Sequence, residues 1–255
     1  MLTAGKAAAS ATFGLVLLHG RGAGSRDIMV FGEALALPDL ALTAPEAAGL
    51  SWWPTSFLAP TPQMEPYVQN GLSQIDAAIQ SYTKAGLPLS RIGLLGFSQG
   101  SCLVSEYLAR SSASLGFGMV LSGGLVGTAD TSKEPNTALY GFGDKVMDYN
   151  TNLSGTQIYM SCHASDPHIP HKRFADSATV LRGLGAAVED RTKPGQGHGI
   201  DQTDVAAVRK MLNVPSLYNS DANVTRADLW RQRVHRVAPD SRAALQHHRA
   251  VTQPA

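Results

Sequence analysis

Three residues of this chain, Ser98, Asp166 and His198, carry the side chains that nucleophilic acyl transfer needs, and they occur in that order. A serine hydroxyl is a poor nucleophile at neutral pH, so an imidazole must accept its proton and a carboxylate must hold that imidazole in one tautomer. Ser98 lies at the centre of Gly96-Phe-Ser-Gln-Gly100, a G-x-S-x-G pattern that predicts a sharp turn between a strand and a helix. The chain order and this turn together predict a Ser-His-Asp triad.

His198 is the predicted base, although three other histidines are candidates: His163, His168 and His171. Those three share the Asp166 loop and the start of the helix after it, so they are poorly placed to reach the serine while Asp166 orients them. His198 follows a separate predicted strand, and its neighbours Gly197 and Gly199 let the backbone come close to the serine. The alternative is that His198 is a turn histidine exposed by its glycines.

Asp166 is the predicted acid because it directly follows a predicted buried strand and precedes Pro167, which fixes a bend. The alternative at this position is an ordinary Asp-Pro turn. Four other aspartates are candidates that fit loop, strand or helix-cap positions better: Asp144, Asp148, Asp190 and Asp201. A zinc site of Cys162, Asp166 and the three nearby histidines is a further alternative, but Pro167 and Pro170 would break the helix that brings the imidazoles onto one face. The sequence therefore predicts no metal site here.

An oxyanion hole needs two N–H groups that converge on the developing negative charge. The N–H of Gln99 begins the helix after the turn, and the loop His19-Gly-Arg-Gly22 would provide the second donor from Arg21. The ring of His19 is predicted to be bonded within that loop. As a hypothesis, the Arg21 side chain favours a substrate that bears a carboxylate.

The elements that must position these residues alternate between strands and helices. Short apolar runs predict strands over 13–18, 40–43, 91–95, 117–121, 157–161 and 187–192. Apolar residues at steps of three and four predict helices over 68–82, 101–110, 170–181 and 205–213. This alternation predicts the α/β class, with a mostly parallel central sheet and helices on both faces. The serine, aspartate and histidine all follow strands, so they are expected beyond the carboxyl ends of the sheet.

Two stretches of the chain have no regular period. Residues 51–66 carry prolines at 54, 60, 62 and 66, which predicts a stiff aromatic loop and excludes a regular helix. Four residues of this loop are predicted either to wall the substrate pocket or to plug the core: Trp52, Trp53, Phe57 and Leu58. Residues 127–155 are polar and rich in glycine, which predicts a loop or lid.

Composition excludes several classes of protein. A net charge of +1 gives no sign that nucleic acid is the main ligand, and no apolar stretch is long enough to span a bilayer. Two cysteines are too few for a disulfide framework, which favours a reducing, cytoplasmic location. The apolar run near the N-terminus leads into His19 with no cleavage site, so it predicts a strand and not a signal peptide.

The length predicts one catalytic domain over residues 1–214, followed by a basic tail over 215–255. The tail is predicted to be mobile. A short amphipathic helix docked on the domain, or an arm for nucleic acid or an anionic membrane, are the alternatives.

Four runs together resemble the phospholipase/carboxylesterase family of α/β-hydrolases, which includes the acyl-protein thioesterases: Leu17-Leu-His-Gly-Arg-Gly22, Gly96-Phe-Ser-Gln-Gly-Ser101, Asp166-Pro-His-Ile-Pro170 and Gly197-His198-Gly199. The resemblance implies an α/β-hydrolase fold and a cofactor-free serine esterase. It also implies Ser98, Asp166 and His198 as the triad and the Arg21 and Gln99 amides as the oxyanion hole. Three features depart from the family pattern, and one is the tail beyond Asn213, which has no counterpart in it. Thioesterase members usually carry a small or apolar residue where Arg21 stands, and Trp52-Trp53-Pro54 indicates a narrow aromatic mouth.

The sequence thus predicts a serine carboxylesterase that acts on small or short-acyl esters through an acyl-enzyme intermediate, as a monomer or homodimer. An acyl thioesterase or lysophospholipase of the same fold is the alternative enzyme. A non-catalytic binding protein with a hydrolase fold is the alternative from another class, although such proteins usually lose a member of the triad.

Overall fold

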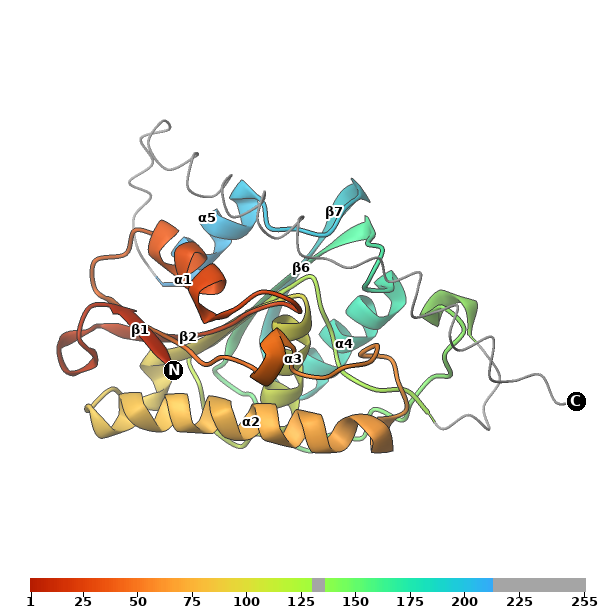
Figure 1. The fold of residues 1–255 in the computed structure, drawn as a ribbon, viewed down its shortest axis with the longest axis horizontal. Coiled ribbons are helices and arrows are strands. Elements are labelled where there is room, and N and C mark those ends of the chain that lie inside the picture. The colour runs from red at the N-terminus through yellow and green to blue at the C-terminus, as the bar shows by residue number, and fades with distance from the viewer. Residues whose placement is uncertain (130–135, 213–255) are drawn as a thin grey trace, which may run out of the picture.

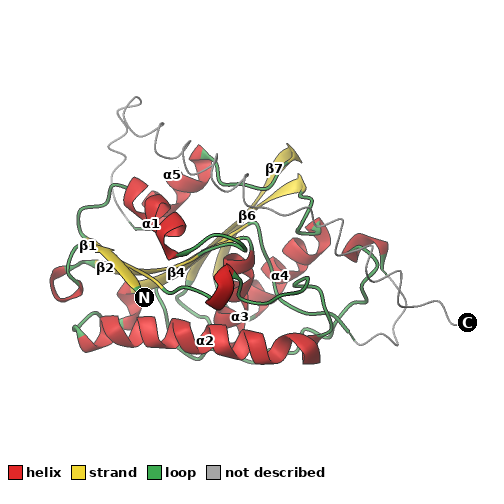
Figure 2. Ribbon diagram, in the orientation of Figure 1, coloured by secondary structure: helices red, strands yellow, loops and turns green. Residues whose placement is uncertain are grey.

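The computed structural model describes residues 1–129 and 136–212, which build a seven-stranded sheet with helices on both faces (Figure 1, Figure 2). The strands are β1 Leu2–Gly5, β2 Phe13–Leu18, β3 Leu40–Ala44, β4 Ile92–Phe97, β5 Phe117–Leu121, β6 Gln157–Ser165 and β7 Ala187–Gln196. The helices are α1 Ser25–Ala34, α2 Thr61–Lys84, α3 Gln99–Arg110, α4 His171–Gly183 and α5 Gln202–Met211. Short 3₁₀ turns lie at Ala8–Ser10, Ala48–Leu50, Leu89–Arg91 and Thr137–Leu139.

The strand order is β1-β3-β2-β4-β5-β6-β7, and β1 pairs antiparallel with β3 while the other neighbouring pairs are parallel. The predicted α/β class with a mostly parallel sheet is therefore confirmed. Every residue of β4 is buried, as expected for a central parallel strand that has helices over both faces. Because parallel strands end at a common edge, the segments that follow β2, β4, β6 and β7 can meet there.

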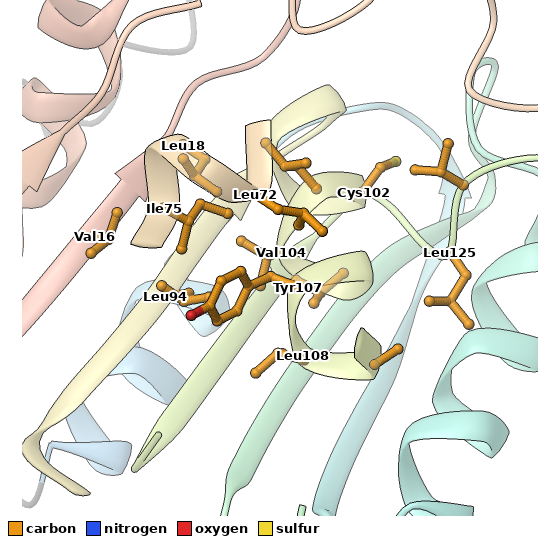
Figure 3. Packing of buried hydrophobic residues seen from close by; sticks show 14 of the residues in the cluster. Val16, Leu18, Leu72, Ile75, Leu94, Cys102, Val104, Tyr107, Leu108 and Leu125 are labelled. Carbon is orange, nitrogen blue, oxygen red and sulfur yellow. The ribbon is translucent and has the colours of Figure 1, made fainter. Parts of the chain in front are cut away.

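Two apolar layers hold the helices to the sheet. Helices α1 and α5 pack on one face, and α2, α3 and α4 pack on the other (Figure 1). Figure 3 shows the second layer, where Ile75 of α2 and Val104 of α3 lie among the strand residues Val16 and Leu94. All four of these side chains are fully buried, so α3, which begins just after Ser98, is fixed by close packing.

The predicted loop over 51–66 is wrong in its second half, because α2 begins at Thr61. Pro60 is the cap residue and Pro62 lies in the first turn, where a helix has no use for the backbone N–H that proline lacks. Pro66 lies inside the helix and removes one hydrogen bond near its start. The apolar face of α2, which includes Val68, Leu72 and Ile75, is buried and outweighs that loss.

Other elements differ from the prediction mainly in extent. Strand β1 and helix α1 were not predicted, and β6 and β7 run four residues further than expected, to Ser165 and Gln196. Their added ends pair with each other, with a shift of register between His163 and Ser165. Strands β2 and β5 have the predicted limits. The described part of 127–155 is loop apart from one 3₁₀ turn.

The predicted tail over 215–255 lies outside the described residues. Among the helices of residues 1–129 and 136–212, none combines the length and apolar character that crossing a bilayer requires.

Candidate active site

Ser98 stands at the turn between β4 and α3 with φ of 54° and ψ of −119°. Residues that carry a side chain rarely adopt a positive φ, and this backbone conformation costs about 1–3 kcal/mol, so the surrounding structure must enforce it. The two flanking glycines show how tight the turn is. A Cβ atom on Gly96 would lie 2.3 Å from the Gly100 oxygen, and one on Gly100 would lie 2.2 Å from the Leu18 oxygen. Both positions therefore require glycine, and the turn presents the Ser98 hydroxyl beyond the end of the sheet.

The structure brings Ser98, His198 and Asp166 together from the ends of three strands. His198 Nε2 lies 2.8 Å from Ser98 Oγ, and His198 Nδ1 lies 2.8 Å and 3.0 Å from the two carboxylate oxygens of Asp166. In the neutral ring, Nδ1–H donates to Asp166, which leaves Nε2 to accept from the Ser98 hydroxyl. The distance from Nε2 to the Ser98 Oγ lies in the range over which a base takes a proton directly from a nucleophile.

Asp166 is a buried carboxylate with several donors. Its side chain accepts hydrogen bonds from the backbone N–H groups of His168 and Ile169, at 2.9 Å and 3.1 Å. Burial alone would raise the pKa of Asp166, but the hydrogen bond and charge of His198 and the two backbone donors hold the pKa below its usual value. Asp166 is therefore ionised at neutral pH. The thiol of Cys162 lies 3.5 Å from the same carboxylate.

The other candidate histidines lie elsewhere than the Ser98 hydroxyl. His168 packs its ring edge-on against His198, with 4.7 Å between the ring centres. His163 lies under the loop that carries His198, because a Cβ atom on Gly197 would come 2.8 Å from its Nε2. His171 is hydrogen-bonded to Thr192 at 2.9 Å. His168 and His163 thus lie against His198 and its loop and His171 lies against Thr192, whereas His198 contacts the serine.

Three of the competing aspartates have other partners. Asp144 pairs with Lys172 at 3.2 Å, and Asp190 pairs with Arg182. Asp201 is the cap residue of α5, as its position in the sequence indicates, and accepts from two backbone N–H groups of the first turn. No cluster of three or more histidine, cysteine, aspartate or glutamate side chains suited to a metal occurs in the described part of the chain.

The loop after β2 lies directly against Ser98, because a Cβ atom on Gly20 would come 3.3 Å from the Ser98 Cβ. His19 Nε2 accepts from the Ala47 N–H at 3.0 Å, so its Nδ1–H donates to the Gly20 carbonyl at 2.8 Å. Burial lowers the pKa of His19, which agrees with this neutral tautomer. Because a trans peptide points its C=O and N–H in opposite directions, fixing the Gly20 carbonyl also fixes the Arg21 N–H.

Gln99 connects the serine turn to the aromatic loop through its side chain, a role that the sequence did not indicate. Its Oε1 accepts from the Trp52 N–H at 2.8 Å, and its Nε2 donates to the Trp53 carbonyl at 2.8 Å. Trp52 donates its indole N–H to the His19 carbonyl at 2.9 Å and stacks on the His19 ring. Trp52 thus ties Gln99, which carries one predicted oxyanion donor, to His19, which lies two residues before the Arg21 N–H that is predicted to be the other.

The four predicted pocket residues are all buried in one apolar cluster: Trp52, Trp53, Phe57 and Leu58. Their burial fits the predicted core plug, and their part in a substrate wall stays a prediction. A hollow of about 560 Å³ lies beside Asp166, between the 3₁₀ turn Thr137–Leu139 and the start of α4, and none of the four residues lines it.

A buried ion pair supports the loop that carries His198. Lys193 and Asp204 lie 2.9 Å apart, with side chains only 1% and 0% exposed. Lys193 also donates to the Gly199 carbonyl at 2.5 Å, and Asp204 accepts from the Asp201 N–H at 2.8 Å. The pair therefore fixes both ends of the turn after His198. The sequence carries no signal for this pair, because a lysine in a strand and an aspartate in a helix give no local pattern.

Comparison with known proteins gives a consistent result. The phospholipase/carboxylesterase family matches residues 5–216 of this chain. The crystal structure of a phospholipase/carboxylesterase from Dyadobacter fermentans DSM 18053 is 31% identical, with a TM-score of 0.71, over 83% of this chain and 95% of that chain. A carboxylesterase from Mesorhizobium loti, 22% identical with a TM-score of 0.59 over 82% and 92% of the two chains, shares the fold.

One curated relative matches over a shorter length. Acyl-protein thioesterase 1 of Gibberella zeae is 32% identical over 134 residues, which are 52% of this chain and 52% of that protein. The match thus spans about half the length of that relative.

Proposed function

Because the chain belongs to the phospholipase/carboxylesterase family of α/β-hydrolases and is a hydrolase, we propose that it is a serine carboxylesterase for small or short-acyl esters. The observation that carries the proposal is the pair of 2.8 Å contacts that join Ser98 to His198 and His198 to Asp166. This arrangement turns an inert alcohol into a nucleophile at neutral pH.

In the first half of the proposed reaction, Ser98 Oγ attacks the ester carbonyl carbon while its proton passes to His198 Nε2. The imidazolium that forms is stabilised by Asp166, which stays ionised. The negative oxygen of the tetrahedral intermediate is held by the N–H groups of Arg21 and Gln99. Collapse of the intermediate breaks the carbon–oxygen bond to the alcohol, which takes the proton from His198 as it leaves.

In the second half, a water molecule replaces the alcohol. His198 takes a proton from the water as its oxygen attacks the acyl carbon of the acyl-enzyme. The second tetrahedral intermediate uses the same two N–H donors. Its collapse releases the carboxylic acid and returns the proton to Ser98, so the enzyme is regenerated with no cofactor.

The preference for small or short acyl groups is supported by the way the aromatic loop is held. Gln99 binds the backbone of Trp52 and Trp53, and the Arg21 guanidinium donates to the Pro54 and Thr55 carbonyls. The loops on this side of Ser98 are therefore fixed to one another, which supports a narrow and rigid mouth. The cytoplasmic location and the monomeric or dimeric state stay predictions.

A second candidate function, hydrolysis of acyl thioesters, is favoured by the similarity to an acyl-protein thioesterase. Lysophospholipid hydrolysis is a further alternative on the same triad. A binding role without catalysis is less well supported, because Ser98, His198 and Asp166 are all present and in contact.

The test measures kcat/KM on ethyl esters from acetate to palmitate, on thioesters of the same acids and on a lysophospholipid, with Ser98→Ala as the control. We expect the highest values on acetyl to hexanoyl esters and no measurable turnover by Ser98→Ala. A fluorophosphonate probe should label wild-type Ser98. Higher kcat/KM on palmitoyl thioesters would favour the thioesterase, and a wild-type protein that neither reacts with the probe nor turns over any substrate would contradict catalysis.

A further inference from the structure

The Arg21 side chain begins beside the nucleophile. A Cβ atom on Gly20 would lie 3.3 Å from the Ser98 Cβ, and the N–H of the next residue, Arg21, is the proposed donor to the substrate carbonyl oxygen. Burial lowers the pKa of His168, whose ring contacts His198, and the positive charge of Arg21 lowers it further. The Arg21 guanidinium therefore acts on the same group of residues that surrounds the reacting atoms.

The guanidinium is held in place but its charge is not neutralised. Nη1 donates to the Pro54 carbonyl at 3.1 Å and Nη2 donates to the Thr55 carbonyl. A guanidinium has five N–H donors, so others remain after these two contacts. Among the described residues no carboxylate pairs with Arg21, whereas Arg110 is paired with two glutamates.

An anion would gain more from this cation than from one in open water. The Arg21 side chain is exposed overall, but its guanidinium is hydrogen-bonded to the backbone of Pro54 and Thr55, and partial burial of the charge there lowers the pKa of the group. A guanidinium that is already partly dehydrated and immobilised loses little further conformational freedom when it binds a carboxylate. Its planar fork matches the two oxygens of a carboxylate.

We infer that Arg21 binds a second carboxylate of the substrate, so that the preferred esters are half-esters of short dicarboxylic acids. This inference rests on the proposed esterase function and narrows its substrate class. The second carboxylate is expected on the acyl side, because the Arg21 N–H is proposed to hold the acyl oxygen. Chains of four or five carbons are short enough to suit the fixed loops around Ser98.

The experiment compares two ethyl esters that differ only in charge, namely monoethyl glutarate and its terminal carboxamide. The measured quantity is the ratio of kcat/KM for the acid to kcat/KM for the amide, because a shift of the Arg21 amide affects both esters alike. In Arg21→Met we expect this ratio to fall about 10- to 100-fold, as expected for loss of a charge-assisted hydrogen bond. Arg21→Lys should keep part of the preference, because it keeps the charge and loses the fork.

Arg26→Met is the matched control, because Arg26 is an exposed arginine five residues further along the chain at the start of α1. It removes the same charge and should leave the ratio unchanged. In the wild type, the ratio should also fall as NaCl is raised, which tests the inference even if Arg21→Met fails to fold. An unchanged ratio in Arg21→Met, or in wild type at high salt, would overturn the inference without contradicting the proposed esterase function. Hydrolysis of neither ester would contradict the proposed function itself.

Discussion

The centre and the edge of the sheet hold their parts of the site in different ways. Ser98 follows β4, whose residues are all buried, and its turn is enforced by steric contact between backbone atoms. His198 follows β7, most of whose side chains are partly or fully exposed, and its loop is held by the Lys193–Asp204 pair. The proposed nucleophile is therefore positioned by packing and the proposed base by buried polar contacts. The two halves should respond differently to substitution and to acid.

The largest effect should come from the polar half of the site. Asp166→Asn keeps the shape of the side chain but removes the charge that stabilises the protonated His198 ring. We expect kcat to fall by about 10⁴-fold. Circular dichroism melting should show that the variant is folded. A loss of less than tenfold would mean that Asp166 does not orient the base.

Lys193→Met tests the ion pair that supports the base. It removes the closest cation from the buried Asp204 carboxylate, which keeps the Tyr159 hydroxyl at 2.9 Å and the Asp201 N–H at 2.8 Å as uncharged donors and Arg191 as a cation 3.6 Å away. We expect the free energy of unfolding to fall by about 4 kcal/mol, together with a lower kcat. Lys210→Met is the control, because Lys210 is 79% exposed and lies 3.7 Å from its partner; it should cost less than about 0.5 kcal/mol. Equal effects of the two substitutions would refute the supporting role.

Gly100→Ala tests the packing half. Its Cβ atom would lie 2.2 Å from the Leu18 oxygen, so β2 or the turn must move. We expect a loss of about 3 kcal/mol in the free energy of unfolding, measured by urea titration, and a weaker reaction with fluorophosphonate. Gly183→Ala, an exposed glycine with open space around it, should change stability by less than about 0.5 kcal/mol. If both variants were equally stable, steric enforcement of the turn would be wrong.

As the pH falls, two buried groups near the site, first His19 and then Asp166, should lose their contributions to the stability of the fold. The folded-state pKa of His19 is lowered by burial, so the stability present above the unfolded value of about 6.5 is lost as pH falls below it. The pKa of Asp166 is also lowered, so its contribution is lost only below about pH 4. His19→Gln should therefore make the fall in unfolding free energy below pH 6.5 shallower, as measured by urea titration at a series of pH values. An identical slope in both proteins would show that His19 does not titrate there.

Prediction of structure from the sequence succeeded where the residues that a turn or strand requires all lie within one short segment. The turn itself needs Gly96 and Gly100, and the short apolar runs of β2 and β5 are typical of buried strands. Their limits could therefore be predicted from local pattern alone.

Prediction failed where tertiary contacts decide. The start of α2 was missed because prolines near a helix end are tolerated once an apolar face is buried. The Lys193–Asp204 pair and the links from Gln99 to the aromatic loop join residues far apart in the sequence, so no periodic signal marks them. Among the candidate site residues, the three of the proposed triad could be named from the sequence, whereas those that hold them in place required the three-dimensional structure.

Both cysteines of the chain are buried close to the triad. Cys102 lies one helical turn after Ser98, where burial raises its pKa to about 12, and Cys162 lies against Asp166. Neither thiol can meet an alkylating reagent while the core is closed. The rate at which the two cysteines are alkylated under native conditions thus measures how often the buried core beside the triad opens.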